Sequence, residues 1–198
     1  MTLRIARVCA LIIVPVTLSI PSFTLAQSLG TEAPQCEIKN FGRVSDSIFR
    51  GAQPRAKDYP VLAKMGVKTV IDLQREGDSK EQGLVEAAGM KFFRVPMSDT
   101  DYPKQEQIER ALQLVSDTAN QPVFVHCAGG RHRTGAVIAM YRMTHEGWDF
   151  DHVFAEMKQY DFNHGFGHGA IKDYVYDQYV QGSQVVSAGA SPANSSNK

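Results

Sequence analysis

Short apolar runs alternate along the chain with segments of helical periodicity, and this alternation restricts the fold more than any other feature. The expected strands are Ile48–Arg50, Lys68–Leu73, Phe92–Val95 and Val123–Val125. The expected helices are Tyr59–Met65, Lys80–Ala88, Gln105–Ala119, Thr134–His145 and two apolar stripes that begin at Phe150 and Ile171. This order predicts a single α/β domain with a mostly parallel central sheet of about four to five strands, flanked by helices on both faces.

The first 26 residues have the pattern of a secretory signal peptide. Arg4 and Arg7 precede an apolar stretch, Val8–Ile20, and the small-residue pattern Thr24–Ala26 follows it. An uncleaved anchor is the alternative, but prolines interrupt the stretch, and a spanning helix needs roughly 20 mainly apolar residues. We therefore expect an exported protein, periplasmic or secreted, with no stable membrane insertion after cleavage.

The rest of the chain reads as one folded unit with polar ends. Residues 27–40 form a polar lead-in, residues 41–181 the folded domain, and residues 182–198 a disordered tail rich in Ser, Ala, Asn and Gly. Cleavage leaves Cys36 and Cys127, which we expect to be free thiols. The 21 basic residues balance 21 acidic ones, so the net charge does not indicate a nucleic-acid partner.

The segment His126–Gly135, HCAGGRHRTG, follows the strongest strand signal and precedes a helix. Ligands of parallel sheets bind beyond the carboxyl ends of the strands, so chemistry is expected here. A helix N-terminus, oriented amides and the Arg133 guanidinium all favour a Cys127 thiolate, the nucleophilic form of the side chain. Gly129 and Gly130 allow the backbone to turn so that successive N–H groups face an anion.

Three further side chains of this segment have expected roles. Arg133 can hold two oxygens of one phosphate with its planar fork. The Thr134 hydroxyl is placed to donate a hydrogen bond to the cysteine sulfur, which stabilises the thiolate. His126 is expected to shape the segment by hydrogen bonding.

HCAGGRHRTG matches the His-Cys-x5-Arg-Ser/Thr signature of the cysteine-dependent protein tyrosine phosphatases at every defining position. The chain resembles the small dual-specificity type over about residues 41–160, including Phe41–Val44, Tyr59–Leu73 and Pro96–Pro103. The resemblance implies a dual-specificity phosphatase fold and hydrolysis of phosphate monoesters through a cysteinyl-phosphate. Cys127 is then the nucleophile, with Arg133 holding the phosphate oxygens, and the reaction needs neither a cofactor nor a metal ion.

The resemblance also requires a general acid upstream, an Asp in a Pro-x-x-Asp pattern with another proline soon after. The segment Pro96–Pro103 offers Asp99 at that spacing and Asp101 as the reserve. A helix cap or a solvated loop acid is the alternative role of either residue.

The substrate phosphate is expected to bind the loop, through Ala128, Gly129, Gly130, Arg131, His132 and Thr134. The run Gly130–Gly135 resembles the Gly-Lys-His-Arg-Thr-Gly of plant and fungal atypical dual-specificity phosphatases, some of which act on inositol pyrophosphates. A basic loop suits multiply phosphorylated substrates; alternatively, Arg131 and His132 face solvent. The expected substrates are phosphotyrosine, phosphoserine or phosphothreonine proteins, or inositol phosphates.

Other polar groups carry weaker signals. His164 and His168 lack the ligand companions of a zinc site, so we expect no metal there. Asp72, Arg75 and Glu76 follow a strand and either reach the pocket or form ion pairs. Two other functions stay open: a rhodanese-like sulfurtransferase, and a phosphate-binding pseudophosphatase that recognises phosphorylated ligands without turnover.

Overall fold

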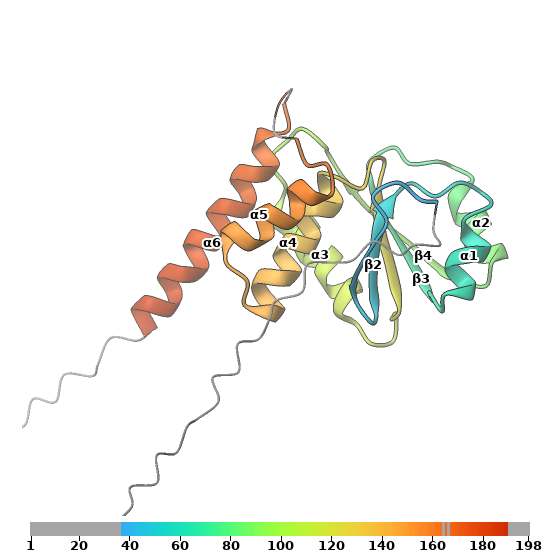
Figure 1. Ribbon diagram of the computed structural model, residues 1–198, viewed down its shortest axis with the longest axis horizontal. Helices are drawn as coiled ribbons and strands as arrows, with labels where there is room; N and C mark the ends of the chain where they lie inside the picture. Colours follow the sequence, from blue (N-terminus) through green and yellow to red (C-terminus); the bar gives the residue numbers. More distant parts are fainter. Residues whose placement is uncertain (1–36, 164, 166, 190–198) are drawn as a thin grey trace, which may run out of the picture.

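The computed structural model describes residues 37–163, 165 and 167–189 of the 198-residue chain, and for residues 185–189 only the backbone (Figure 1). The predicted signal peptide, most of the predicted lead-in and residues 190–198 lie outside this part, as does Cys36. Cys127 is a free thiol. In the described residues, no helix has both the length and the apolar character needed to cross a membrane.

The central sheet contains five strands in the order β1-β2-β5-β3-β4. They are β1 (Gly42–Ser45), β2 (Ile48–Ala52), β3 (Thr69–Gln74), β4 (Lys91–Met97) and β5 (Val123–Cys127). β2, β5, β3 and β4 run parallel, and only β1 pairs antiparallel, with β2. The predicted α/β class is therefore confirmed, while β1 is an additional edge strand that the sequence did not reveal.

Helices cover both faces of the sheet (Figure 1). They are α1 (Tyr59–Lys64), α2 (Glu81–Ala87), α3 (Gln105–Ser116), α4 (Arg133–Glu146), α5 (Phe150–Gln159) and α6 (Gly169–Gly189). α1 and α2 pack on one face, and the other four form a thicker layer on the opposite face. Within that layer α4 contacts β5, and α5 and α6 pack against the outer side of α4.

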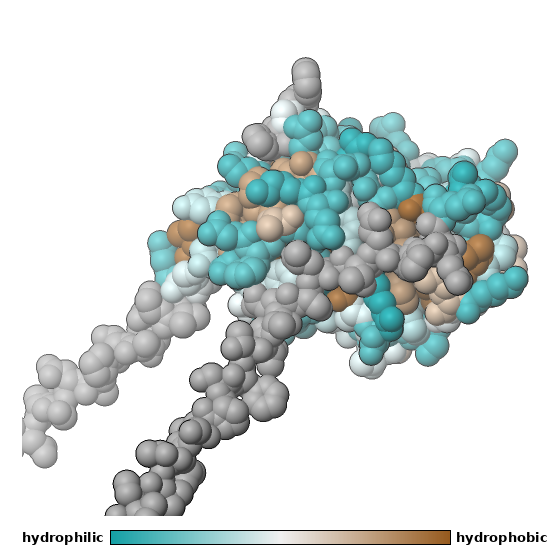
Figure 2. Space-filling model, viewed as in Figure 1, coloured by the Kyte–Doolittle hydropathy of each residue, from teal (hydrophilic) through white to brown (hydrophobic). Residues whose placement is uncertain are grey.

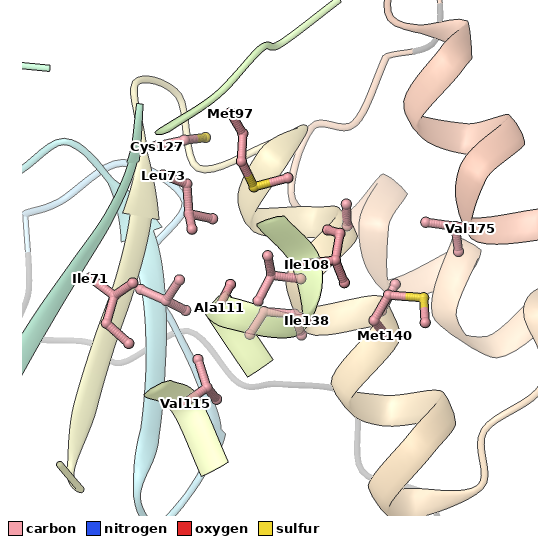
Figure 3. Packing of buried hydrophobic residues seen from close by; sticks show 14 of the residues in the cluster. Ile71, Leu73, Met97, Ile108, Ala111, Val115, Cys127, Ile138, Met140 and Val175 are labelled. Atoms are coloured by element: carbon pink, nitrogen blue, oxygen red, sulfur yellow. The ribbon is translucent and has the colours of Figure 1, made fainter. Parts of the chain in front are cut away.

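The core consists of two buried apolar clusters, one on each face of the sheet. Neighbouring residues of β5 alternate between them: Val123 and Val125 face the α3–α6 side, and Phe124 faces the α1–α2 side. A strand that is apolar on both faces belongs at the centre of a covered sheet. The face of the molecule seen in Figure 2 is mostly hydrophilic. Figure 3 shows the larger cluster extending from Val115 to Cys127 and Met97.

The C-terminal ends of two helices, α3 and α6, lie well away from the predicted ones. α3 ends at Ser116 instead of Ala119, because the Asp117 carboxylate accepts a hydrogen bond from the Ala119 amide (2.9 Å) and turns the chain. α6 continues to Gly189, past residue 181 where the sequence analysis ends the folded domain. Glycine and serine lower helix propensity by at most about 1 kcal/mol each, so a helix already anchored at Ile171 and Val175 can continue through them.

Candidate active site

The cysteine loop joins the end of β5 to the start of α4 at the carboxyl edge of the sheet. Cys127 is the last residue of β5, and Arg133 is the first residue of α4. Cys127 is 2% exposed and Arg133 8% exposed, and both are held by rigid elements. Figure 3 places Cys127 and Met97 together at this end of the core, so the loop begins where the buried cluster ends.

The loop turns sharply at Gly130, which has a φ of +67°. A Cβ atom there would lie 2.5 Å from the backbone carbon of Gly51 and 2.6 Å from the nitrogen of Ala52. Strand β2 runs beside β5 with Ala52 opposite Cys127, so the loop folds directly over the end of β2. Only glycine combines this conformation with this close approach.

The carbonyl groups of the loop are bound on its outer side. Arg50 Nη2 donates to the Gly130 oxygen at 2.9 Å, Asn40 Nδ2 donates to the Gly129 oxygen at 2.8 Å, and the Gln53 amide donates to the Ala128 oxygen at 3.3 Å. The peptide groups are thereby oriented with their amides toward the inside of the curl, and the Gly130 and Thr134 amides help to lower the pKa of the Cys127 thiol. This is the inward-facing arrangement of N–H groups that binds an anion.

The Cys127 thiol has a pKa below its ordinary value. Burial by itself raises this pKa, but hydrogen bonding by the Thr134 hydroxyl, the charge of Arg133 and the amides of Thr134 and Gly130 together outweigh the burial. The loop therefore favours a thiolate, the form that attacks phosphorus. The roles expected for Cys127 and Thr134 are consistent with these contacts.

Arg133 and Asp99 share a cavity of about 180 Å³ next to the loop, lined by Gln74, Arg75, Glu76, Met97, Ser98, Asp99 and Arg133. Arg133 Nη1 donates to the Met97 carbonyl at 3.2 Å, which points the guanidinium into the cavity. Arg133 Nη2 lies 4.0 Å from Asp99 Oδ2, and the Asp99 side chain is 51% exposed. A carboxyl so placed can meet a leaving group entering from solvent.

Asp101, the alternative acid, lies apart from Arg133. It is exposed and lines a neighbouring cavity of about 210 Å³ with Tyr102 and Lys104. Of the two aspartates, the structure brings Asp99 to the cysteine loop. Arg75 and Glu76 line the Arg133 cavity, and Arg75 Nε also lies 3.9 Å from Glu76 Oε1, so both roles left open for them, the pocket and the ion pair, are observed.

Arg131 and His132 turn away from the Arg133 cavity. Arg131 Nε lies 3.9 Å from Asp161 Oδ2, and His132 Nε2 donates to the Asn163 carbonyl at 3.0 Å. Both partners belong to the segment between α5 and α6, so the side chains pack against that segment instead of lining the Arg133 cavity. Ala128, also expected to bind phosphate, is exposed at the rim, and only its backbone can take part.

The ring of His126 contacts a buried charged network on the α1–α2 side of the sheet. His126 Nε2 lies 2.8 Å from Glu81 Oε1, which also accepts from the Tyr59 hydroxyl at 3.0 Å. Burial raises the pKa of Glu81, but the contacts with His126 and Tyr59 hold it below the ordinary value. The His126 side chain therefore faces Glu81 instead of the loop that it was expected to hydrogen-bond, and the network with Glu81 was not anticipated from the sequence.

Asp72, Glu81 and His126 form a cluster whose possible ligand atoms lie within 4.8 Å of one another. Arg94 Nε already binds Asp72 Oδ2 at 2.8 Å, and its Nη2 lies 3.9 Å from Glu81 Oε2. A guanidinium in this position neutralises the two carboxylates and repels a cation. These residues do not fit a metal site.

These features are those of a cysteine-dependent phosphatase. Cys127, with its lowered pKa, lies at the end of a parallel strand, the loop amides face inward, and Arg133 shares a cavity with the Asp99 carboxyl. A family model described as the tyrosine phosphatase family matches residues 36–185. The chain belongs to this family.

Curated relatives carry phosphatase names. Over 126 residues the chain is 29% identical to the probable tyrosine-protein phosphatase DG1060 of Dictyostelium discoideum, covering 61% of this chain and 75% of the relative. It is 30% identical to the dual specificity protein phosphatase TpbA of Pseudomonas aeruginosa (74% and 63% covered) and 29% identical to the inositol diphosphatase SIW14 of Saccharomyces cerevisiae (63% and 46% covered). The matches thus span about half to three quarters of these relatives' own lengths.

Solved structures share the fold. The crystal structure of P. aeruginosa TpbA aligns with a TM-score of 0.66 at 27% identity and covers 81% of this chain and 97% of TpbA. The catalytic core of the S. cerevisiae phosphatase SIW14 aligns with a TM-score of 0.63 at 23% identity and covers 80% of this chain and 96% of that core. The dual-specificity phosphatase fold implied by the cysteine signature is confirmed.

Proposed function

We propose that this protein hydrolyses phosphate monoesters with Cys127 as nucleophile, Arg133 and the loop amides as the phosphate site, and Asp99 as general acid. One observation carries the proposal: a thiol whose pKa is lowered by Thr134 and Arg133 lies at the end of the strand from which the phosphate-binding loop starts, and the same arginine shares a cavity with Asp99.

The reaction has two steps. In the first, the Cys127 thiolate attacks phosphorus, an S–P bond forms, the ester P–O bond breaks, and the Asp99 carboxyl gives its proton to the departing oxygen. In the second, water attacks the cysteinyl-phosphate, the Asp99 carboxylate takes a proton from that water, and the S–P bond breaks to return the thiolate. Arg133 and the loop amides stabilise the charge on the equatorial oxygens in both steps.

The proposed substrate is a phosphorylated protein or an inositol phosphate. Relatives with protein phosphatase names and relatives with inositol diphosphatase names match the chain about equally well. The basic side chains at the Arg133 cavity are Arg133 itself and Arg75. Arg75, which lies 3.9 Å from Glu76 in the same cavity, is the proposed partner of a second anionic group of the substrate, and its replacement by Ala should affect multiply phosphorylated substrates most.

The test is phosphate release from p-nitrophenyl phosphate, a phosphotyrosine peptide and inositol polyphosphates by the purified chain in EDTA. We expect turnover by the wild type and none by Cys127→Ser, which should still bind vanadate or phosphate. A radiolabelled phosphoenzyme trapped by acid quench, present in the wild type and absent from Cys127→Ser, would identify the intermediate.

The alternatives predict other outcomes of the same experiment. A pseudophosphatase binds phosphate or vanadate but releases nothing from any of these substrates. A sulfurtransferase consumes thiosulfate in the presence of cyanide and forms a persulfide at Cys127 instead of a phosphoenzyme. Either outcome would replace the proposed function.

We further propose that the protein is exported, on the basis of the signal-peptide pattern in residues 1–26. Expression of the full chain in a bacterium should then yield a periplasmic or secreted product whose N-terminal sequence begins at Gln27. A cytoplasmic product that retains Met1, or an uncleaved product in the membrane fraction, would contradict this proposal.

A further inference from the structure

The segment that joins α5 to α6 lies across both the cysteine loop and the loop that carries Asp99. On the cysteine loop it contacts His132, whose Nε2 donates to the Asn163 carbonyl at 3.0 Å. On the Asp99 loop it contacts Asp99, whose carbonyl oxygen lies 2.7 Å from His168 Nδ1, and Gly167 lies close to Thr100, since a Cβ added at Gly167 would be 3.6 Å from Thr100 Cγ2. The segment therefore joins the nucleophile side of the site to the acid side.

His168 is the residue of this segment that contacts both loops. Its Nδ1 lies 2.7 Å from the Asp99 carbonyl oxygen, and because a carbonyl only accepts, Nδ1 is the donor. Its ring stacks on the ring of His132, with centroids 3.7 Å apart and planes 12° from parallel. His132 is itself held edge-on against Phe162 at 5.2 Å. One face of the His168 ring is thus packed on the His132 ring, while Nδ1 at its edge donates to the Asp99 carbonyl.

The Asp99 loop is held from other elements mainly at its two ends. Arg133 Nη1 donates to the Met97 carbonyl (3.2 Å), and the Tyr102 hydroxyl donates to the Asp177 carboxylate (2.9 Å). Within the loop, the Ser98 hydroxyl accepts from the amides of Thr100 and Asp101 at 3.4 and 3.3 Å, both long. Among the described residues, the bond from His168 is the hydrogen bond that reaches the Asp99 backbone from another element. It fixes the peptide plane that follows Asp99, and with it the direction in which the Asp99 side chain leaves the backbone.

We propose that His168 is a positioning residue for the general acid: donating from Nδ1 while stacked on His132, it holds the Asp99 carbonyl and aims the Asp99 carboxyl at the leaving oxygen. This inference rests on the proposed phosphatase function and concerns one step of it.

The charged groups around His168 are compatible with this role. The Asp99 carbonyl lies at its Nδ1, and the His132 ring, just before the first residue of α4, stacks on its face. Arg131 precedes His132 in the loop. Burial and the nearby His168 lower the pKa of His132 to about 4, so His132 is neutral above that pH and the stack does not place two positive rings face to face.

The test compares two substrates with different leaving groups. Phenolate is a much stronger base than p-nitrophenolate, so phenyl phosphate depends far more on proton donation than p-nitrophenyl phosphate does. His168→Phe keeps a stacking ring and removes the donor. We expect its kcat to fall about tenfold on phenyl phosphate and about twofold or less on p-nitrophenyl phosphate, a fraction of the 10²–10⁴-fold effect typical of a whole general acid.

Two further variants separate positioning from folding. His168→Asn loses the ring, but its side-chain amide nitrogen can take the place of Nδ1, so the ratio of the two kcat values should return toward wild type. His145→Phe is a matched control, because His145 also stacks on a ring, that of Tyr141 (4.7 Å), and binds Ser116 Oγ (3.1 Å) far along α4 from the site. Its ratio should not change.

The double variant Asp99→Asn, His168→Phe should be no slower on phenyl phosphate than Asp99→Asn alone, because the donor has no acid left to aim. Equal losses on both substrates for His168→Phe and His168→Asn, or losses that add in the double variant, would overturn the positioning role. A wild type that releases phosphate from neither substrate would instead overturn the proposed function.

Discussion

Arg50, from the strand next to β5, donates a hydrogen bond from Nη2 to the carbonyl oxygen of Gly130 at 2.9 Å. The Arg50 side chain is fully buried, and its guanidinium lies 3.8 Å from the centre of the Tyr160 ring. Burial lowers the pKa of Arg50, and the negative charges of Glu156 and of the Cys127 thiolate act in the opposite direction. Arg50, which lies outside the cysteine signature, therefore both binds the Gly130 carbonyl of the loop and interacts with the charge of Cys127.

Replacing Arg50 by Met should destabilise the protein and impair the loop. The substitution keeps much of the side-chain volume but leaves the buried Gly130 carbonyl without its donor, which costs roughly 1–3 kcal/mol. Urea unfolding measures the loss, and phosphate release should fall with it. Arg43→Met is the control: Arg43 pairs with Asp46 on the surface (2.6 Å), so its loss should stay below about 1 kcal/mol. Equal effects of both substitutions would contradict this account of Arg50.

Two adjacent glycines should respond very differently to alanine. Gly130→Ala places a Cβ 2.5 Å from the backbone of Gly51 at a positive φ, so the loop must shift. Gly129→Ala places a Cβ no closer than 3.5 Å to its neighbours, in this case the Arg131 side chain. With strain of about 1–3 kcal/mol at the first position, we expect at least a tenfold loss of kcat/KM for Gly130→Ala and less than threefold for Gly129→Ala. Similar activities would show that the curl is not required.

Part of this site was predictable because its chemistry lies in consecutive residues. Cys127, Arg133, Thr134 and the loop glycines occur within one ten-residue segment between a strand and a helix. The parallel sheet followed from the alternation of apolar runs, and Asp99 followed from the Pro-x-x-Asp pattern that the family resemblance implies. In each case the signal is local, so a single sequence is sufficient to detect it.

The remaining contacts depend on tertiary packing. Arg50 reads as a strand residue, Glu81 as an ordinary acid in the first turn of a helix, and His168 as part of a glycine-rich loop. Arg50 reaches the site because the sheet order places β2 beside β5, Glu81 because α2 packs on the face of the sheet that carries His126, and His168 because the segment before α6 folds back. The directions of Arg131 and His132 are set by that same segment, which is why their placement against it was not predicted.

Thr134→Val should raise the pKa of the Cys127 thiol. The Thr134 hydroxyl is the side chain that contributes most to lowering this pKa, and valine has the same shape without the donor. A hydrogen bond to a charged group stabilises that group, so without the hydroxyl the pKa of the Cys127 thiol should rise. The pH dependence of alkylation by iodoacetamide measures the shift. Thr134→Ser should restore the wild-type midpoint, and an unchanged midpoint in Thr134→Val would exclude this contact as its cause.

Asp99→Asn and Asp101→Asn distinguish the two candidate acids. Asp99 shares a cavity with Arg133, whereas Asp101 is exposed in the next one. Asp99→Asn should lower kcat on phenyl phosphate about 10²-fold. Asp101→Asn should keep the wild-type rate. The opposite pattern would assign the acid to Asp101.

His132 should make the stability of the protein depend on pH in the mildly acidic range. Burial, then the charge of His168, lower its pKa from 6.5 to about 4 in the folded protein. Below pH 6.5 the unfolded chain binds a proton at this histidine that the folded protein does not, so the free energy of unfolding falls as pH drops from about 6.5 to about 4.

His132→Phe keeps a ring in the stack and removes the titration. Urea unfolding at pH 7 and pH 5 should show a smaller loss for His132→Phe than for the wild type. His145→Phe, which leaves the surroundings of His132 intact, should show the wild-type loss, and an equal loss in all three proteins would assign the pH dependence to other groups.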